Sequence, residues 1–103
     1  MTSYTVQRIA GQRLEAIHDY SARRWGAEKA DAYIHQFFDF FQQVARKEVP
    51  WRPIPAALAV SGYYARCGQH FVYWKVLSDG TVGIVTVLHE RMHQLDHFRH
   101  DDI

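Results

Sequence analysis

The sequence predicts a single α+β domain in which a helical hairpin packs on a small antiparallel sheet, in the order β-α-α-β-β-β. A chain of 103 residues is long enough for one hydrophobic core and too short for two. Apolar residues recur at helical spacing in the first half of the chain and at alternate positions after Gly62. With 48% hydrophobic and 15% aromatic residues, the chain can bury a core and is not expected to be disordered.

The first half of the chain is predicted to hold one strand and two helices. Residues 4–9 contain β-formers and are expected to form a strand at the sheet edge, before Gly11 breaks the pattern. Helical spacing then predicts helices over residues 12–25 and 27–47. The apolar stripes are Leu14, Ile17, Tyr20 or Ser21, and Trp25 in the first helix, and Ala30, Ile34, Phe37, Phe41 and Val44 in the second. Gly26 between them predicts a tight antiparallel hairpin, because glycine ends a helix at low conformational cost.

The second half is predicted to form a three-stranded meander. Three prolines between residues 50 and 55 are expected to exclude regular structure there. Alternating apolar residues predict strands over residues 63–67, 71–77 and 81–88, with Asp79-Gly80 as a hairpin turn. The last of these strands is almost entirely apolar, which indicates a central strand covered on both faces. Residues 89–103 form a polar, His-rich tail within the single domain, which spans residues 1–103.

The composition excludes several classes of protein. Twelve Lys and Arg balance eleven Asp and Glu, so the basic excess of a protein that coats nucleic acid is missing. The single cysteine, Cys67, cannot form an internal disulfide, which indicates a reducing compartment. No apolar run is long enough to span a membrane, and no apolar signal segment follows Met1. We therefore expect a cytoplasmic protein that needs no membrane and no cofactor.

One string fits a metal-binding pattern. His89-Glu90-Arg91-Met92-His93 matches H-E-x-x-H, which in zinc peptidases places two imidazoles one helical turn apart. Here the string directly follows an apolar strand near the end of the sequence, which leaves too little chain to build a peptidase cleft. Incidental binding of zinc or nickel by His89, His93 and His97 is a second interpretation. A solvated His-rich tail is the favoured one, so no metal site is predicted.

A second group of residues has the chemistry of an RNA-cleaving site. Arg66, Lys75, His89 and Arg91 lie on or just after neighbouring strands. If they converged on one face, they could hold a phosphate and supply a general acid or base. Charges on strands more often mark a solvated face, and this second interpretation is favoured. His70, at a predicted turn, is expected to be a surface residue rather than a catalytic one.

Four segments in this order and spacing carry a resemblance to a known family. They are IHDYSARRWG at 17–26, GYYARC at 62–67, HFVYWKV at 70–76 and VLHERM at 87–92. Together they resemble the ParE branch of the RelE/ParE toxins from bacterial type II toxin–antitoxin systems, over nearly the whole chain. His89 and Met92 match the family's Ile-Leu-His-x-x-Met ending, which makes the zinc pattern a coincidence. The resemblance implies the RelE/ParE-like β-α-α-β-β-β fold.

The resemblance also implies a function. A ParE-like toxin inhibits DNA gyrase by binding, has no catalytic residues, and is neutralised by a ParD-type antitoxin. DNA would be reached only through gyrase or the antitoxin. The alternative is a ribosome-dependent mRNA endoribonuclease of the RelE type, but only Arg66 and Lys75 on the later strands and Arg52 before them could hold RNA. A third interpretation is a degenerate toxin that only forms the antitoxin complex and represses its own operon.

Two binding surfaces are predicted. The helical hairpin has surplus apolar residues flanked by charges, which is typical of a surface for a partner helix. The residues expected to bind antitoxin are Arg23, Arg24, Trp25, Ile34, Phe38 and Phe41. The end of the last strand and the tail are expected to bind gyrase through His89, Arg91, Met92 and Leu95, with Arg66 and Lys75 as weaker candidates.

Overall fold

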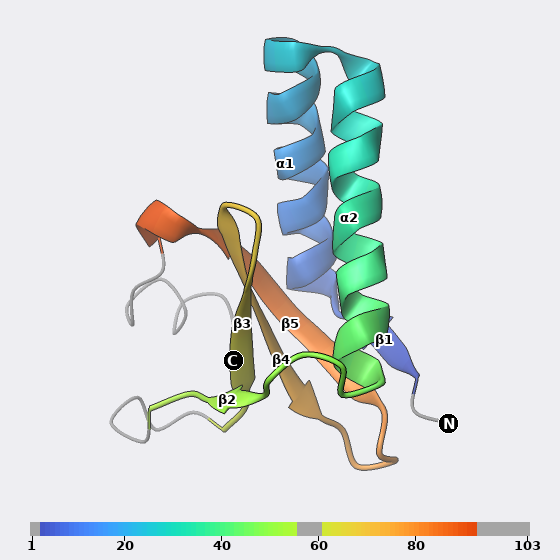
Figure 1. Cartoon of the computed structure of the whole chain (residues 1–103), viewed down its shortest axis with the longest axis vertical. Helices are drawn as coiled ribbons and strands as arrows, with labels where there is room; N and C mark the ends of the chain where they lie inside the picture. The colour runs from blue at the N-terminus through green and yellow to red at the C-terminus, as the bar shows by residue number, and fades with distance from the viewer. Residues whose placement is uncertain (1–2, 56–60, 93–103) are drawn as a thin grey trace.

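Two helices cover one face of a five-stranded sheet in a computed structural model that describes residues 3–55 and 61–92 (Figure 1). The strands lie in the order β1-β5-β4-β3-β2. The α+β class and the helical hairpin on a small sheet are therefore confirmed. The N-terminal strand and the last strand lie side by side although they are far apart in the sequence.

The sheet is mixed, which corrects the purely antiparallel prediction. Strand β1 (Tyr4–Val6) runs parallel to β5 (Val82–His89) at the edge of the sheet. The other neighbours, β4 (His70–Val76), β3 (Tyr63–Cys67) and β2 (Arg52–Pro53), pair antiparallel in turn. The parallel pair arises because the helical hairpin returns the chain to the other end of the sheet, as a crossover connection does.

The first strand is shorter than predicted, and the first helix starts earlier. The backbone N–H of Gln7 donates to Ile84 O at 3.0 Å, and Gln7 O already accepts from Gly11 N at 2.9 Å. The chain thus passes from the sheet into helix α1 (Arg8–Trp25) without a loop. Gly11 lies in the first turn of this helix and does not break the pattern.

The hairpin turns at a single glycine, as predicted. Gly26 has φ 98°, a conformation that side-chain-bearing residues rarely adopt, and it separates α1 from α2 (Ala27–Ala45). Its N–H donates to Ala22 O, and its carbonyl accepts from Ala30 N.

None of the helices in the described part of the chain has the length and apolar character needed to cross a membrane.

Hydrophobic clusters lie on both faces of the sheet. The larger one joins the helices to the sheet and contains the fully buried rings of Phe37, Phe41 and Trp74. The smaller one lies on the opposite face and contains Ile54, Tyr73, Val85 and Leu88. Every residue of β5 from 82 to 88 is buried, which confirms the prediction of a central strand covered on both faces.

A β-bulge reverses the alternation of side chains along β5. Tyr73 pairs with Thr86, but the next residue on β4, Trp74, pairs with Ile84, so Val85 is an extra residue on β5. From this point the faces exchange, because one added residue shifts the period-two pattern. Val87 therefore joins the helix-facing cluster.

The proline-rich segment is not free of regular structure, contrary to prediction. Arg52 and Pro53 form β2 and pair with Tyr64 and Tyr63. A proline is tolerated there because β2 is an edge strand, where no further strand requires its missing N–H.

Candidate functional site

A groove of about 820 Å³ lies between α1, the start of α2, the β3–β4 turn and the end of β5. On the helical side it is lined by Ile17, Tyr20 and Trp25, and on the sheet side by Val87 and Leu88. The aromatic rings of Tyr20 and Trp25 are 56% and 54% exposed and contact each other edge to face at 6.1 Å. Two large exposed rings beside an apolar groove are typical of a binding surface.

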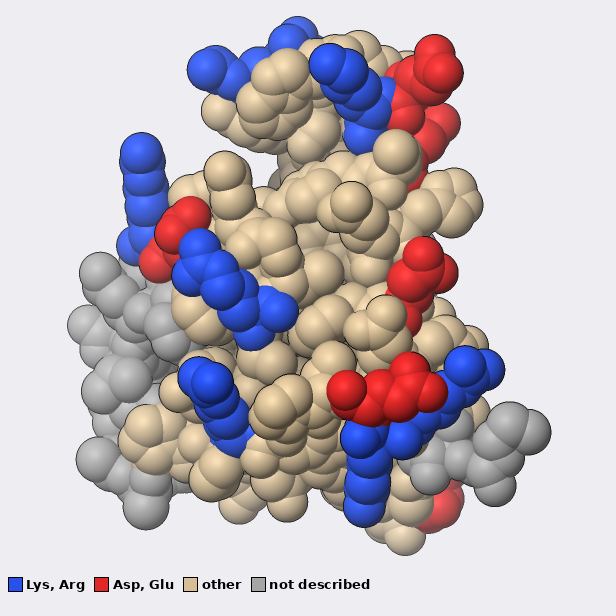
Figure 2. Space-filling model, viewed as in Figure 1, with Lys and Arg blue, Asp and Glu red and all other residues tan. Residues whose placement is uncertain are grey.

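Besides two tyrosines, the ionisable groups of the groove are basic side chains or imidazoles. Arg13, Lys29, His70 and His89 line it, and no Asp or Glu is among its lining residues in the described part of the chain. Figure 2 shows further Lys and Arg side chains at the end of the hairpin where α1 meets α2, with Asp and Glu gathered toward α2. The groove therefore suits an apolar segment that carries negative charge.

His70 lies at the floor of this groove and is only 8% exposed. This corrects its assignment as a surface or turn residue: it begins β4 and its ring packs edge to face on Phe37, with centroids 5.5 Å apart. Burial, and next the neighbouring His89, lower the pKa of His70 from 6.5 to about 4, although Glu90 opposes the shift. The imidazole is therefore neutral at physiological pH.

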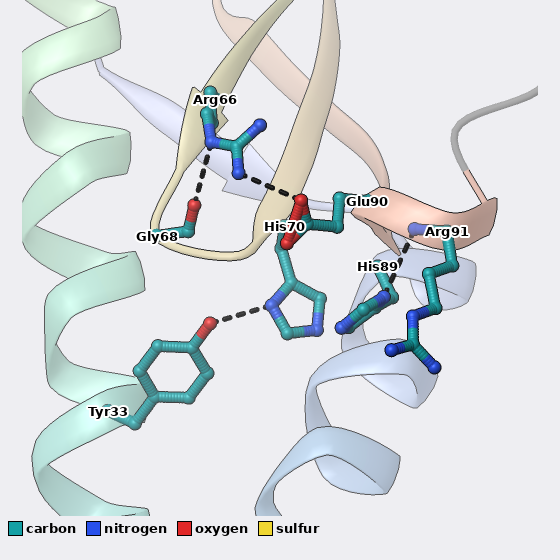
Figure 3. A network of polar contacts seen from close by, with 7 residues as sticks. All are labelled: Tyr33, Arg66, Gly68, His70, His89, Glu90 and Arg91. Carbon is teal, nitrogen blue, oxygen red and sulfur yellow. Dashed lines mark hydrogen bonds and ion pairs between the residues drawn. The ribbon is translucent and has the colours of Figure 1, made fainter.

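Tyr33 fixes the His70 ring from the helical side. Its phenolic oxygen lies 2.7 Å from His70 Nδ1 (Figure 3). Burial raises the pKa of Tyr33, while a backbone hydrogen bond from Gln69 lowers it. The turn also packs on this ring, because a Cβ at Gly68 would lie 3.2 Å from Tyr33 Oη. A glycine with φ 61° thus permits close contact between the β3–β4 turn and α2.

Arg66 and Glu90 tie the end of the chain's last strand to the same turn. Arg66 donates to Glu90 Oε1 at 3.0 Å and to Gly68 O at 3.1 Å (Figure 3). The N–H of Glu90, the first residue of η2 (Glu90–Met92), donates to Gln69 O at 2.9 Å. Arg66 also lies over the Phe71 ring at 5.5 Å. Its charge is thus engaged in holding η2 rather than free for a phosphate.

The group proposed for RNA cleavage is not brought together as a whole. Arg66 pairs with Phe71 and His89 pairs with His70, so these residues and Arg91 lie at one end of the sheet. Lys75 pairs with Gly83, four residues farther along β4 than Phe71. At about 3.4 Å per residue this is a separation of about 14 Å.

The chain offers no activated thiol either. Burial raises the pKa of Cys67 to about 11, so its thiol stays protonated at physiological pH and is a poor nucleophile.

Among the described residues no group of three or more His, Cys, Asp or Glu side chains is placed to hold a metal ion. His93 and His97, the other members of the possible metal set, lie outside the described residues.

The residues predicted to bind antitoxin differ in exposure. Arg23, Arg24 and Trp25 are exposed in the last turn of α1, with Arg24 over the Trp25 ring at 5.5 Å. Ile34 is half-buried and Phe38 is 38% exposed. The prediction that Phe41 binds antitoxin is wrong, because its ring is fully buried in the core and cannot contact a partner.

The residues predicted to bind gyrase are only partly described. His89 and Arg91 lie at the end of β5 and in η2, and η2 ends at Met92. Leu95 lies outside the described residues.

Three residues of the groove were not assigned to a site from the sequence. They are Ile17, Tyr20 and Tyr33, although Ile17 and Tyr20 belong to the predicted apolar stripe of the first helix.

Comparisons with known proteins agree with this architecture. A family model described as the ParE toxin of the type II toxin–antitoxin system parDE matches residues 4–94. The chain is 33% identical to Toxin ParE1 of Caulobacter vibrioides over 99 residues, which cover 94% of this chain and 98% of that protein. It is 30% identical to Toxin ParE of Escherichia coli over 92 residues, covering 89% and 88% of the two chains.

A solved structure shares the fold. It is described as the chromosomal ParDE TA system from P. aeruginosa, and it matches with a TM-score of 0.70 and 18% identity over 86% of this chain and 96% of that one. The structural match shows a shared fold only, whereas the family model and the sequence relatives show common ancestry. The chain therefore belongs to the ParE toxin family of type II toxin–antitoxin systems.

Proposed function

We propose that this protein acts in the cytoplasm as a toxin that inhibits DNA gyrase by binding, without catalysis, and that a ParD-type antitoxin neutralises it by occupying the groove. The observation that carries the proposal is the groove itself: it is apolar, it exposes Tyr20 and Trp25, and its charged lining residues are basic. Membership of the ParE family supports the target and the kind of antitoxin.

The groove suits an amphipathic segment of the antitoxin. Large aromatic side chains such as Tyr20 and Trp25 provide most of the binding energy in many interfaces. The basic residues Arg13 and Lys29 would steer an acidic segment and fix its orientation. A segment that folds on binding can cover a long groove of this kind.

Neutralisation would follow if the antitoxin covered the surface that binds gyrase. That surface is proposed at His89, Arg91, Met92 and Leu95, with Arg66 and Lys75 as weaker contributors. His89 also lines the groove, and Arg91 follows two residues later. An occupant of the groove would therefore lie against the edge of the proposed toxic surface and block it sterically.

A gyrase assay tests the mechanism. Purified protein added to gyrase and relaxed plasmid is expected to abolish supercoiling or to trap cleaved DNA, and the antitoxin is expected to restore normal activity. Normal supercoiling at a large excess of the protein contradicts the proposal. If mRNA were instead cut on ribosomes while gyrase stayed active, the RelE-type alternative would replace it. Expression without any toxicity would point to a degenerate toxin.

Paired substitutions test the groove. Trp25→Ala and Tyr20→Ala are each expected to weaken antitoxin binding by about 2 kcal/mol, as for exposed aromatic anchors. The matched control is Val76→Ala, because Val76 is 50% exposed but lies on β4 away from the groove. Equal affinities for all three variants, measured by calorimetry, would place the antitoxin elsewhere.

A further inference from the structure

Two imidazoles face each other at the sheet end of the groove. His70 and His89 are register partners, and their ring centroids lie 5.2 Å apart at an angle of 86°. Figure 3 shows the rings turned toward each other, and both residues line the groove. Within the described residues, Nε2 of neither ring has a hydrogen-bond partner, and neither Nε2 is a buried unpartnered atom. Both nitrogens are therefore open to the groove.

The tautomer of His89 follows from its backbone contact. Its Nδ1 accepts a hydrogen bond from the N–H of Arg91 at 3.1 Å. A nitrogen that accepts carries no proton, so the neutral ring has its proton on Nε2. His89 thus presents an N–H donor to the groove.

The same reasoning applies to His70. Its Nδ1 contacts the Tyr33 hydroxyl at 2.7 Å. The Tyr33 oxygen also accepts a backbone hydrogen bond from Gln69, and we assign its O–H as the donor to His70 Nδ1. The proton of the neutral His70 ring is then on Nε2. Both rings thus present an N–H donor at the groove that they line.

We infer that these two Nε2–H groups form a socket for one carboxylate, and that an Asp or Glu of the ParD-type antitoxin fills it. This inference rests on the proposed function, because it assumes that the antitoxin occupies the groove. A carboxylate is the fitting ligand, since when ionised it only accepts hydrogen bonds and can accept from two donors at once. A metal ion would need a lone pair on Nε2, and moving the proton to Nδ1 would break the hydrogen bonds from the Arg91 N–H and the Tyr33 O–H.

The surrounding charges favour an anion at this position. The titratable groups around the socket are Arg13 from α1, Lys29 and Tyr33 from α2, Arg66 and Cys67 from β3, and Glu90 and Arg91 from η2. The single carboxylate among them, Glu90, is already bonded to Arg66. A carboxylate at this position would therefore accept from two N–H donors and lie in a region whose other charged groups are mostly basic.

Two variants of His89 test the donor at Nε2. His89→Asn keeps an acceptor where Nδ1 stood but removes the donor at Nε2, so the antitoxin is expected to bind about ten- to a hundredfold more weakly. His89→Gln places an amide N–H near Nε2, so most of the affinity should remain. The matched control is His35→Asn, because His35 is exposed on α2 and does not line the groove.

The measurement is calorimetry of the complex. The wild-type protein, His35→Asn and His89→Gln are expected to bind with similar affinity, and His89→Asn more weakly. One Asp→Asn or Glu→Gln change in the antitoxin segment should weaken binding to the wild-type protein about as much as His89→Asn does, and should have little further effect on the His89→Asn variant. In the free protein, nitrogen NMR of the imidazoles should show the Nε2–H tautomer for both rings.

The outcomes distinguish this inference from the proposed function. If Trp25→Ala weakens binding but His89→Asn binds as tightly as the wild-type protein, the socket is wrong and the groove stands. If binding is insensitive to Trp25 as well, both proposals fail. An Nδ1–H tautomer of His70 in the free protein would overturn the socket without reference to any partner.

Discussion

His89 lies directly opposite His70 across β4 and β5, and a β-bulge puts it there. The extra residue, Val85, exchanges the two faces of β5 beyond it, so His89 shares the helix-facing side with Val87. In a regular strand His89 would share the face of Val85 and point away from the helices. The bulge thus brings His89 to the groove beside His70.

The buried His70 is expected to make stability depend on pH. Its pKa is lowered from 6.5 to about 4 in the folded protein, so between these values the unfolded chain binds the proton and the folded one does not. Its contribution is complete above about pH 6.5 and is lost as the pH falls toward 4. We expect the free energy of unfolding to drop by about 1 to 3 kcal/mol over this window, and nearer the lower value because Nε2 meets solvent in the groove.

Urea unfolding at several pH values checks this prediction. His70→Asn keeps an acceptor for the Tyr33 hydroxyl but cannot titrate, so its stability should fall less between pH 6.5 and 4 than that of the wild type. His35→Asn should behave like the wild type, because His35 is exposed. Parallel pH profiles for all three proteins would show that other groups, such as carboxylates, account for the dependence.

Much of the fold could be predicted because it depends on local patterns. The helical stripes, Gly26 at the hairpin and the apolar last strand are each visible within a short window of sequence, and all three are confirmed. The parallel pairing of β1 was not predictable in this way, since it depends on where the helical hairpin returns the chain. The strand at Pro53 was missed because only its place at the sheet edge makes a proline acceptable.

The site was harder to predict because four separate segments build it. The β-bulge leaves no local signal in the sequence, so the face on which His89 lies could not be read from alternation. Burial of His70 depends on Tyr33 and Phe37 from α2, which are more than thirty residues away. Neighbouring phenylalanines on one helix likewise looked equivalent, although the packing of α2 against the sheet buries Phe41 and exposes Phe38.

Phe38 and Phe41 should therefore have opposite effects when truncated. Phe41→Ala is expected to cost about 3 to 5 kcal/mol of stability, since it opens a cavity in the core. Phe38→Ala is expected to cost about 1 kcal/mol or less, because its ring is partly exposed, although it contacts Phe41 edge to face at 5.7 Å. Phe38 does not line the groove, so antitoxin binding should weaken in Phe38→Ala only through contacts that the antitoxin makes on α2 beyond the groove. Urea unfolding and calorimetry of each variant separate the two effects, and a loss of affinity without one of stability in Phe41→Ala would contradict the assignment.

Charge reversal at Arg24 should slow association with the antitoxin. Arg24 lies over the ring of Trp25, which lines the groove, so Arg24→Glu both repels an acidic segment and removes a cation–π contact. We expect a several-fold slower association at low salt and a smaller difference at high salt, as measured by stopped-flow fluorescence. Arg46→Glu is the matched control, because Arg46 caps the C-terminal end of α2 at the other end of the hairpin. Equal rates for the two variants would remove Arg24 from the binding surface.

Two neighbouring tryptophans should respond differently to replacement by phenylalanine. The Nε1 of Trp74 is buried and has no hydrogen-bond partner among the described residues, whereas that of Trp51 donates to Val44 O at 3.0 Å. Trp74→Phe leaves a small cavity but removes an unsatisfied donor, so the two effects should cancel to within about 1 kcal/mol. Trp51→Phe loses a hydrogen bond, while Val44 O keeps the one from the Lys47 N–H, so it should cost about 1 kcal/mol. Urea unfolding measures the free energy of unfolding of both variants. If the Trp74→Phe protein were less stable than the Trp51→Phe protein, the loss of ring volume rather than the loss of the N–H donor would determine the stability of these variants.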